Sequence, residues 1–106
     1  MTESILERVK TAAVKRLLFL PHTIRQMSRP DRMITTKDIE NVIMMGEVIE
    51  DYPEDSRGHR CLILGTGTDR RSIHVVCAPK DEYLAIITTY RPDPTQWTPD
   101  LKERLA

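Results

Sequence analysis

Four strand-like segments in the second half of the chain constrain the fold more than any other feature. They are rich in β-branched and aromatic residues and cover residues 47–52, 61–65, 73–77 and 84–90. Turn-forming stretches separate them at residues 53–58, 67–71 and 79–82. Runs of this length between such turns are typical of strands that pair with their sequence neighbours. The pattern therefore predicts a four-stranded antiparallel β-meander.

The first part of the chain has helical spacing. Residues 4–18 place apolar side chains at positions 5, 6, 9, 13 and 17, and Ser4 with Glu7 has the pattern of a capping box. Residues 18–20 could instead form a short strand, because the residue before a proline avoids the helical region. A second, short helix is expected from His22 to about residue 29, where Pro30 ends it.

The third helix is expected over residues 35–45. Thr35 and Asp38 form a capping box, and Gly46 is placed where a left-handed glycine would end the helix. A short terminal helix is expected after Thr98, with a proline in its first turn. The predicted fold class is α+β, with N-terminal helices packed on the four-stranded antiparallel meander.

Strand alternation predicts two apolar sheet faces. If residues 66 and 72 pair across the turn, Cys61 lies opposite Cys77. In the proposed register of the last two strands, Arg71 lies opposite Tyr90. One face then carries residues 63, 73, 75, 77, 84 and 86, and the other carries residues 62, 64, 74, 76, 85 and 87. Since both faces are apolar, helices or a partner should cover both. For the cysteines we expect two buried reduced thiols, although a strained cross-strand disulfide is geometrically conceivable.

Size and charge restrict the function classes. A chain of 106 residues predicts one domain, with residues 1–18 as a helical extension and residues 20–100 as the core. No apolar run is long enough to span a bilayer and no signal sequence is apparent, so a cytoplasmic location without membrane association is expected. The chain has 16 basic and 16 acidic residues. Because it is not basic overall, any nucleic-acid role requires a local basic patch.

A series of short motifs supports a family resemblance. They are His22, Arg32 with residues 34–35, and the stretches 45–47, 49–53, 61–65, 73–76, 86–90 and 92–94, followed by Trp97. Their order over residues 20–100 resembles a family of uncharacterised small bacterial and archaeal domains in the RelE/ParE-like toxin superfamily. The chain departs from that family at Thr23, where the family has alanine, and at Gln26, where it has arginine. The resemblance implies helices against a curved antiparallel sheet.

The resemblance also implies a chemistry. RelE-like ribonucleases activate a ribose 2′-OH to attack the neighbouring phosphate, which requires a base, an acid and cations but neither a metal nor another cofactor. The implied function is a metal-independent endoribonuclease, an mRNA interferase of a toxin–antitoxin system. The candidate catalytic residues are His74, Tyr90 and Arg91. The candidate RNA-binding residues are His22, Arg32, Arg60 and Arg71.

A non-catalytic function is also consistent with several of the same residues. A histidine on an apolar strand face is commonly a hydrogen-bonded core residue, and His74 has that position. The neutral net charge and the acidic stretch 47–55 favour a protein-interaction domain that kept the toxin fold. Its partner would be an antitoxin-like protein or a second copy of the chain. The spacing of the histidines and cysteines does not match a zinc site, so no metal ligands are assigned.

Overall fold

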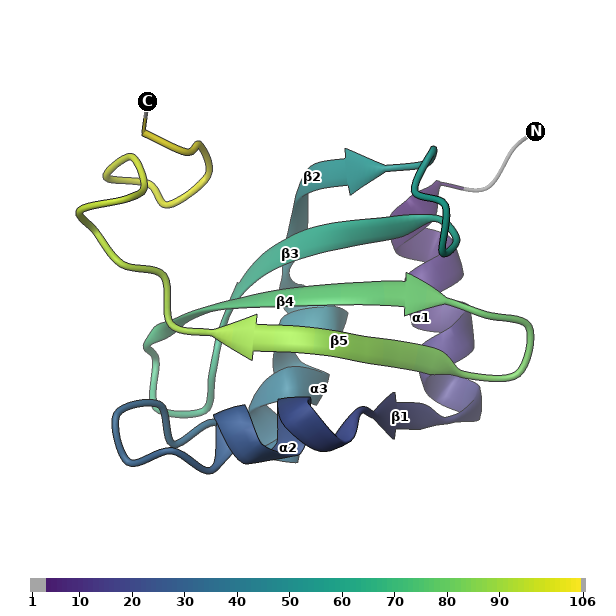
Figure 1. The fold of residues 1–106 in the computed structure, drawn as a ribbon, viewed down its shortest axis with the longest axis horizontal. Coiled ribbons are helices and arrows are strands. Elements are labelled where there is room, and N and C mark those ends of the chain that lie inside the picture. Colours follow the sequence, from purple (N-terminus) through teal and green to yellow (C-terminus); the bar gives the residue numbers. More distant parts are fainter. Residues whose placement is uncertain (1–3, 106) are drawn as a thin grey trace.

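The computed structural model describes residues 4–105, which form a five-stranded sheet and three helices (Figure 1). The elements are α1 (Ile5–Lys15), β1 (Leu17–Phe19), α2 (Pro21–Met27), α3 (Thr36–Met45), β2 (Glu47–Tyr52), β3 (Arg60–Thr66), β4 (Ser72–Pro79) and β5 (Leu84–Tyr90). The strand order is β1-β5-β4-β3-β2, in which β1 is parallel to β5 and the other pairs are antiparallel. The fold is α+β, and none of the helices among these residues is long and apolar enough to cross a membrane.

The predicted meander is present as β2 to β5, but the prediction of four strands was wrong. The fifth strand, β1, has three residues and pairs Leu17 with Leu84 and Phe19 with Ile86. The short strand offered as an alternative for residues 18–20 is present one residue earlier, but three residues are too few to show an alternation that would indicate its place in the sheet. Its partner is also distant in sequence, so the turn spacing that predicted the other pairings gave no information about this one.

The caps of the first and third helices agree with the sequence. In α1 the Ser4 hydroxyl accepts a hydrogen bond from the Glu7 amide, and in α3 both halves of the Thr35–Asp38 capping box are formed. The predicted left-handed conformation at Gly46 was wrong, because its φ of −84° and ψ of −177° are extended. Glycine is needed there for space: a Cβ would collide with the Val42 carbonyl oxygen and lie 2.6 Å from that of Leu64.

The C-terminal segment is not the predicted short helix. After β5 it runs through turns and folds back so that Trp97 and Arg104 form an isolated antiparallel bridge. Leu101 has a φ of +63°, in the left-handed region that a continuing α-helix excludes. The segment is instead held by side-chain contacts with the sheet, which are described below.

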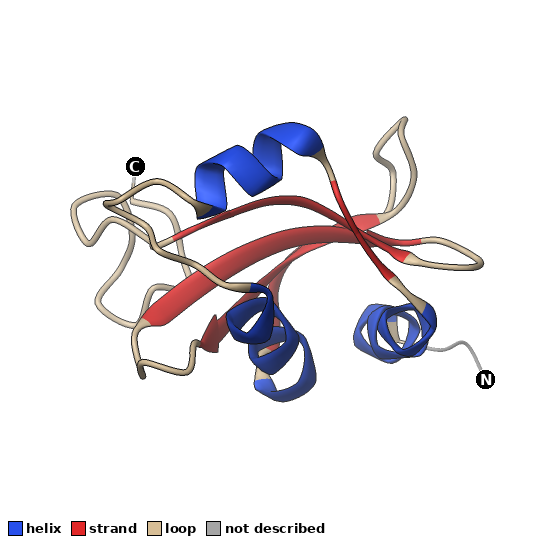
Figure 2. Ribbon diagram, turned by 90° about the horizontal axis from the view of Figure 1, so that it is seen from below, coloured by secondary structure: helices blue, strands red, loops and turns tan. Residues whose placement is uncertain are grey.

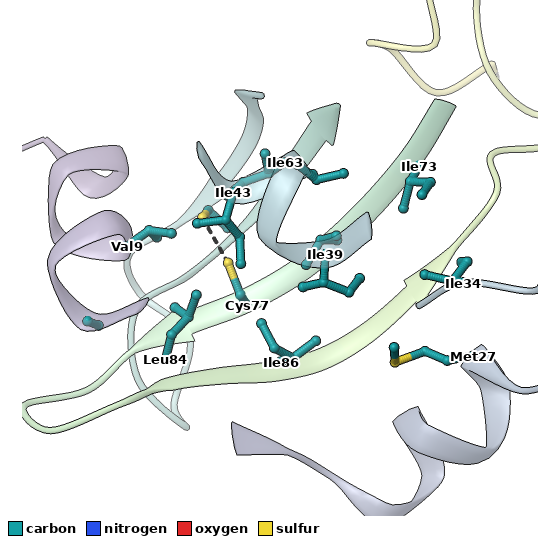
Figure 3. Close-up of a cluster of buried hydrophobic side chains, with 14 residues drawn as sticks. Val9, Met27, Ile34, Ile39, Ile43, Ile63, Ile73, Cys77, Leu84 and Ile86 are labelled. Atoms are coloured by element: carbon teal, nitrogen blue, oxygen red, sulfur yellow. Dashed lines mark hydrogen bonds between the residues drawn. The ribbon is translucent and has the colours of Figure 1, made fainter. Parts of the chain in front are cut away.

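Helices lie on both sides of the sheet (Figure 2): α1 and α3 cover one face and α2 lies on the other. The face under α1 and α3 carries the main hydrophobic core (Figure 3). The six residues assigned to this face from the sequence are all buried there, namely Ile63, Ile73, Val75, Cys77, Leu84 and Ile86. Full burial of one such aliphatic side chain contributes about 1.5–3 kcal/mol, so this face is the main source of stability.

The turn between β3 and β4 has the predicted symmetry. Thr66 pairs with Ser72, and Cys61 lies opposite Cys77. Both thiols are buried and free, with their sulfur atoms 4.0 Å apart (dashed line in Figure 3). The contact with Cys61, together with burial, raises the pKa of the Cys77 thiol well above its ordinary value. The pair therefore packs as two small hydrophobic side chains.

The register between β4 and β5 differs from the prediction along its whole length. The predicted pairing of Arg71 with Tyr90 would place Cys77 opposite Leu84, which is a shift of two residues from the observed register. Cys77 pairs with Ile86, but Val76 pairs with Thr88, so Ile87 is an extra residue in β5. A one-residue bulge moves every later side chain to the opposite face. The shift of two residues and the bulge together place Tyr90 opposite His74, and the predicted pairing of Tyr90 with Arg71 was wrong.

Candidate functional site

A pocket of about 500 Å³ lies on the α2 side of the sheet, where β5 ends and the C-terminal segment folds back. It combines basic, aromatic and amide side chains. Its lining residues are Arg32, Val76, Thr88, Tyr90, Arg91, Asp93, Gln96, Trp97 and Arg104. Three of these, Arg32, Tyr90 and Arg91, are candidates from the sequence.

His74 is next to this pocket and is completely buried. Its Nδ1 is 3.2 Å from the Tyr90 hydroxyl, and its Nε2 is 2.9 Å from the carbonyl oxygen of Leu101. A carbonyl only accepts, so Nε2 carries the proton and donates to Leu101, while Nδ1 accepts from the Tyr90 hydroxyl. These two hydrogen bonds fix one tautomer of the neutral imidazole, in which the lone pair of Nδ1 is directed at the Tyr90 hydroxyl.

Aromatic packing holds the His74 ring in place. Trp97 meets it edge-to-face at a centroid distance of 4.4 Å, and Tyr90 does so at 5.3 Å. Burial lowers the pKa of His74, because the charged imidazolium would lose its hydration. Burial likewise raises the pKa of the Tyr90 phenol. Both groups are therefore neutral at pH 7.

Arg91 and Arg32, the two arginines of the pocket that were named from the sequence, differ in how many of their N–H donors are already used. Arg91 is largely committed: its Nε donates to the Arg32 carbonyl at 2.7 Å, and its Nη2 is 3.1 Å from the Asp69 carboxylate. Arg32 uses one nitrogen to donate to the Thr89 carbonyl at 3.2 Å. A guanidinium has five N–H donors, so Arg32 keeps most of its capacity to bind an anion.

Arg104 closes the pocket on the side of the C-terminal segment. Its guanidinium stacks on Trp97 with a 4.8 Å distance to the ring centroid, and it makes two hydrogen bonds to the Glu50 carboxylate, at 2.9 and 3.1 Å. Burial alone would raise the pKa of Glu50, but hydrogen bonds from Arg104 and Tyr52 outweigh it and the pKa is lowered. The charged Glu50–Arg104 pair thus fastens the segment to β2.

Three of the candidates lie outside the pocket. His22 is exposed in the first turn of α2. Arg60 begins β3, at the end of the sheet away from His74, and forms an ion pair with Asp55 at 3.3 Å. Arg71 is exposed in the β3–β4 turn, 3.9 Å from the Asp69 carboxylate. The structure therefore brings together His74, Tyr90, Arg91 and Arg32. Arg71 shares the Asp69 carboxylate with Arg91 but does not line the pocket, and His22 and Arg60 do not line it either.

Sequence reasoning missed the contribution of the C-terminal segment. Trp97, Gln96 and Arg104 line the pocket, and the Leu101 carbonyl fixes the His74 tautomer. The only tryptophan of the chain, in an otherwise polar tail, was a usable signal, because such a side chain usually finds a surface to pack against. Arg104 gave no comparable signal, since basic residues are common near chain ends.

The pocket can bind an anion beside a proton-transfer pair. Arg32 supplies positive charge, whereas the charge of Arg104 is paired with Glu50, and the Tyr90 hydroxyl connects the pocket to the buried imidazole. Tyrosine and histidine are both capable of general acid–base catalysis when they lie within hydrogen-bond distance of the proton they transfer. Within residues 4–105, no three histidine, cysteine or acidic side chains are grouped so that they could hold a metal ion.

Comparison with known proteins gives a family assignment. No curated protein and no solved structure matched the chain. The family model described as "Domain of unknown function (DUF4258)" matches residues 19–91, which include all of β1 to β5 except the first two residues of β1. His74, Tyr90, Arg91 and Arg32 lie within the matched region, whereas Trp97 and Arg104 lie outside it. The chain belongs to this domain-of-unknown-function family.

Proposed function

We propose that the protein is a metal-independent endoribonuclease related to the RelE/ParE-like toxins, and that it cleaves RNA in the pocket at Tyr90. The observation that carries this proposal is the hydrogen bond between the Tyr90 hydroxyl and the buried His74 imidazole beside a pocket lined by arginines. Such a pair supplies the proton transfer, and the guanidinium groups supply the charge, that cleavage by a ribose 2′-OH requires.

The proposed reaction uses Tyr90 as a proton relay. The ribose 2′-OH gives its proton to the Tyr90 oxygen as the phenol proton moves to Nδ1 of His74. The 2′-oxygen forms a bond to the adjacent phosphorus, the bond from phosphorus to the 5′-oxygen breaks, and the proton returns through Tyr90 to the 5′-oxygen. The products are a 2′,3′-cyclic phosphate and a 5′-hydroxyl. The lowered pKa of His74 keeps the imidazole in the neutral form that accepts the proton.

Arg32 is the proposed phosphate contact. Its fork geometry suits bidentate binding of phosphate oxygens, and within residues 4–105 its guanidinium makes one hydrogen bond, to the Thr89 carbonyl. Arg91 is assigned a positioning role, because its hydrogen bond to the Arg32 carbonyl holds the loop that carries Arg32. In this proposal, His22, Arg60 and Arg71 bind RNA only outside the cleavage pocket.

The test is RNA cleavage by the folded wild-type protein and two variants, on free and ribosome-bound RNA. Tyr90→Phe removes only the hydroxyl, and Arg32→Gln removes the charge. Loss of the acid–base group is expected to lower the cleavage rate by about two to four orders of magnitude. Tyr83→Phe, in the β4–β5 turn, is the matched control and should cleave at the wild-type rate. Full activity of Tyr90→Phe, or no cleavage by the wild type on either RNA, would refute the enzyme proposal.

We also propose a non-catalytic alternative, in which the chain is a protein-interaction domain that kept the toxin fold. A groove of about 520 Å³ between α1, β1 and α3 favours it, since its lining is mainly apolar and includes Val14, 82 % exposed, and Met44, 50 % exposed. The proposed occupant is a second copy of the chain, with an antitoxin-like protein as the other outcome. Light scattering at micromolar concentration decides: a dimer lost in Val14→Asp supports self-association, and a monomer argues against it.

A further inference from the structure

A second polar pocket, of about 170 Å³, lies between α1 and the β4–β5 turn. Figure 1 shows that α1 lies beside this turn, at the end of the sheet away from the C-terminal segment. Arg8 and Lys15 reach the pocket from α1, and Lys80 reaches it from the turn. The two α1 residues are seven positions apart, which places them on the same helix face two turns apart.

The positive charge of this pocket is not neutralised. Within residues 4–105, none of the three cations has a carboxylate oxygen within ion-pair distance. Asp81 is the one acid that lines the pocket, so three positive charges and one negative charge leave a net charge of +2. Asp51, which lies on the far side of the His59 ring from Arg8, is 2.5 Å from Nε2 of His59.

Each cation is held in place by a neutral partner. Arg8 donates to Nδ1 of His59 at 3.0 Å, Lys15 donates to the Asp81 carbonyl at 2.7 Å, and Lys80 donates to the Arg57 carbonyl at 3.1 Å. An ammonium group has three donors and a guanidinium has five, so each side chain keeps unused donors after these contacts. The charges are therefore brought together on anchored side chains rather than spread over free ones.

We propose that this pocket binds a phosphate group, carried by a nucleotide or by an RNA backbone. Phosphate suits the site because its oxygens accept several charge-assisted hydrogen bonds at once, and the Thr11 hydroxyl adds a further donor to the lining. The site is separate from the pocket at Tyr90. Lys80 comes directly after β4 and follows His74 by six residues, which corresponds to about 20 Å of extended chain. Its phosphate binding is therefore independent of the proposed cleavage reaction.

The experiment titrates the full chain with inorganic phosphate, a mononucleotide and a short single-stranded RNA, followed by backbone amide NMR shifts. The variant Lys15→Gln/Lys80→Gln removes two cations without shortening the side chains greatly. Lys10→Gln, on the same helix but outside the pocket lining, is the matched control. We expect the double variant to bind the tightest of the three probes at least about tenfold more weakly. The control should bind like the wild type.

The three probes identify the source of the phosphate. Tighter binding of the mononucleotide than of RNA assigns a nucleotide site, and tighter binding of RNA assigns a backbone contact. Either result supports the proposal if the shifts centre on α1 and the β4–β5 turn and the double variant loses them. Binding by none of the probes at millimolar concentration, or binding unchanged in the double variant, overturns the proposal. Cleavage of RNA at Tyr90 is measured separately and does not affect this result.

Discussion

Replacement of His74 by alanine tests how far this residue supports the fold. The side chain is completely buried and connects three parts of the molecule: β4, the end of β5 through Tyr90, and the C-terminal segment through Leu101 and Trp97. His74→Ala removes both hydrogen bonds and both aromatic contacts. It also leaves a cavity at the point where the C-terminal segment meets the sheet.

The expected loss can be built up from these contacts. The hydrogen bonds at 2.9 and 3.2 Å contribute about 1 kcal/mol each. The two edge-to-face contacts add about 0.5–1.5 kcal/mol each. The sum of about 3–5 kcal/mol agrees with the range for truncating large buried side chains. For a domain of this size it corresponds to a fall in Tm of more than about 10 °C.

Urea unfolding at pH 7.5 measures the difference in the free energy of unfolding between the wild type and His74→Ala. The pH dependence of this difference adds a second readout. Because burial lowers the pKa of His74, the unfolded chain binds the proton more readily than the folded chain. The stabilisation is full above the unfolded pKa, near 6.5, and is lost as pH falls toward the lower folded pKa. The wild type should therefore lose more stability than His74→Ala between pH 7.5 and 5.5. If His74→Ala lowers the free energy of unfolding by less than about 1 kcal/mol at pH 7.5, the structural role assigned to His74 is wrong.

Two further substitutions test the elements that position the sheet. Asp38→Ala should lower the free energy of unfolding by about 2–4 kcal/mol, because it removes the Asp38 half of the α3 capping box and the acceptor of two Thr68 hydrogen bonds, at 2.7 and 2.8 Å. Lys37→Ala, whose side chain is 76 % exposed, is its control in the same urea assay. Gly46→Ala should cost more than about 2 kcal/mol, because the new Cβ meets two backbone carbonyl oxygens that cannot rotate away. Met45→Ala, 80 % exposed, should have little effect, and a Gly46→Ala protein as stable as this control would show that the strand entry can shift.

Some parts of the fold that depend on local chemistry were predictable. The Thr35–Asp38 capping box and the symmetric turn that pairs Thr66 with Ser72 are set by residues close in sequence, and both were predicted. The pairing of β1 with β5 brings together residues 67 positions apart, such as Leu17 and Leu84, and no local pattern encodes it. Gly46 shows a different limit: the sequence indicated a special glycine, but the reason was close packing against Leu64 and not a positive φ.

The candidate site was predictable only in part, and the bulge at Ile87 explains why. With uninterrupted alternation from Leu84, Tyr90 would have shared the core face with Ile86. The extra residue places Tyr90 beside His74, which a sequence pattern of period two cannot anticipate. Four of the residues named from the motifs, His74, Tyr90, Arg91 and Arg32, lie close together, whereas the predicted pairing of Tyr90 with Arg71 was wrong.

The C-terminal segment bears on both the structural role of His74 and its proposed catalytic role. The family match ends at Arg91, yet the carbonyl that fixes the His74 tautomer and the tryptophan that packs on its ring both come from residues beyond it. The segment is fastened by the Glu50–Arg104 pair, which is charged at neutral pH. As a structural residue, His74 depends on the C-terminal segment to stay buried. The proposed proton relay depends instead on access from the pocket to the Tyr90 hydroxyl. Both roles are compatible in one molecule, because the imidazole uses Nε2 for the cover and Nδ1 for Tyr90.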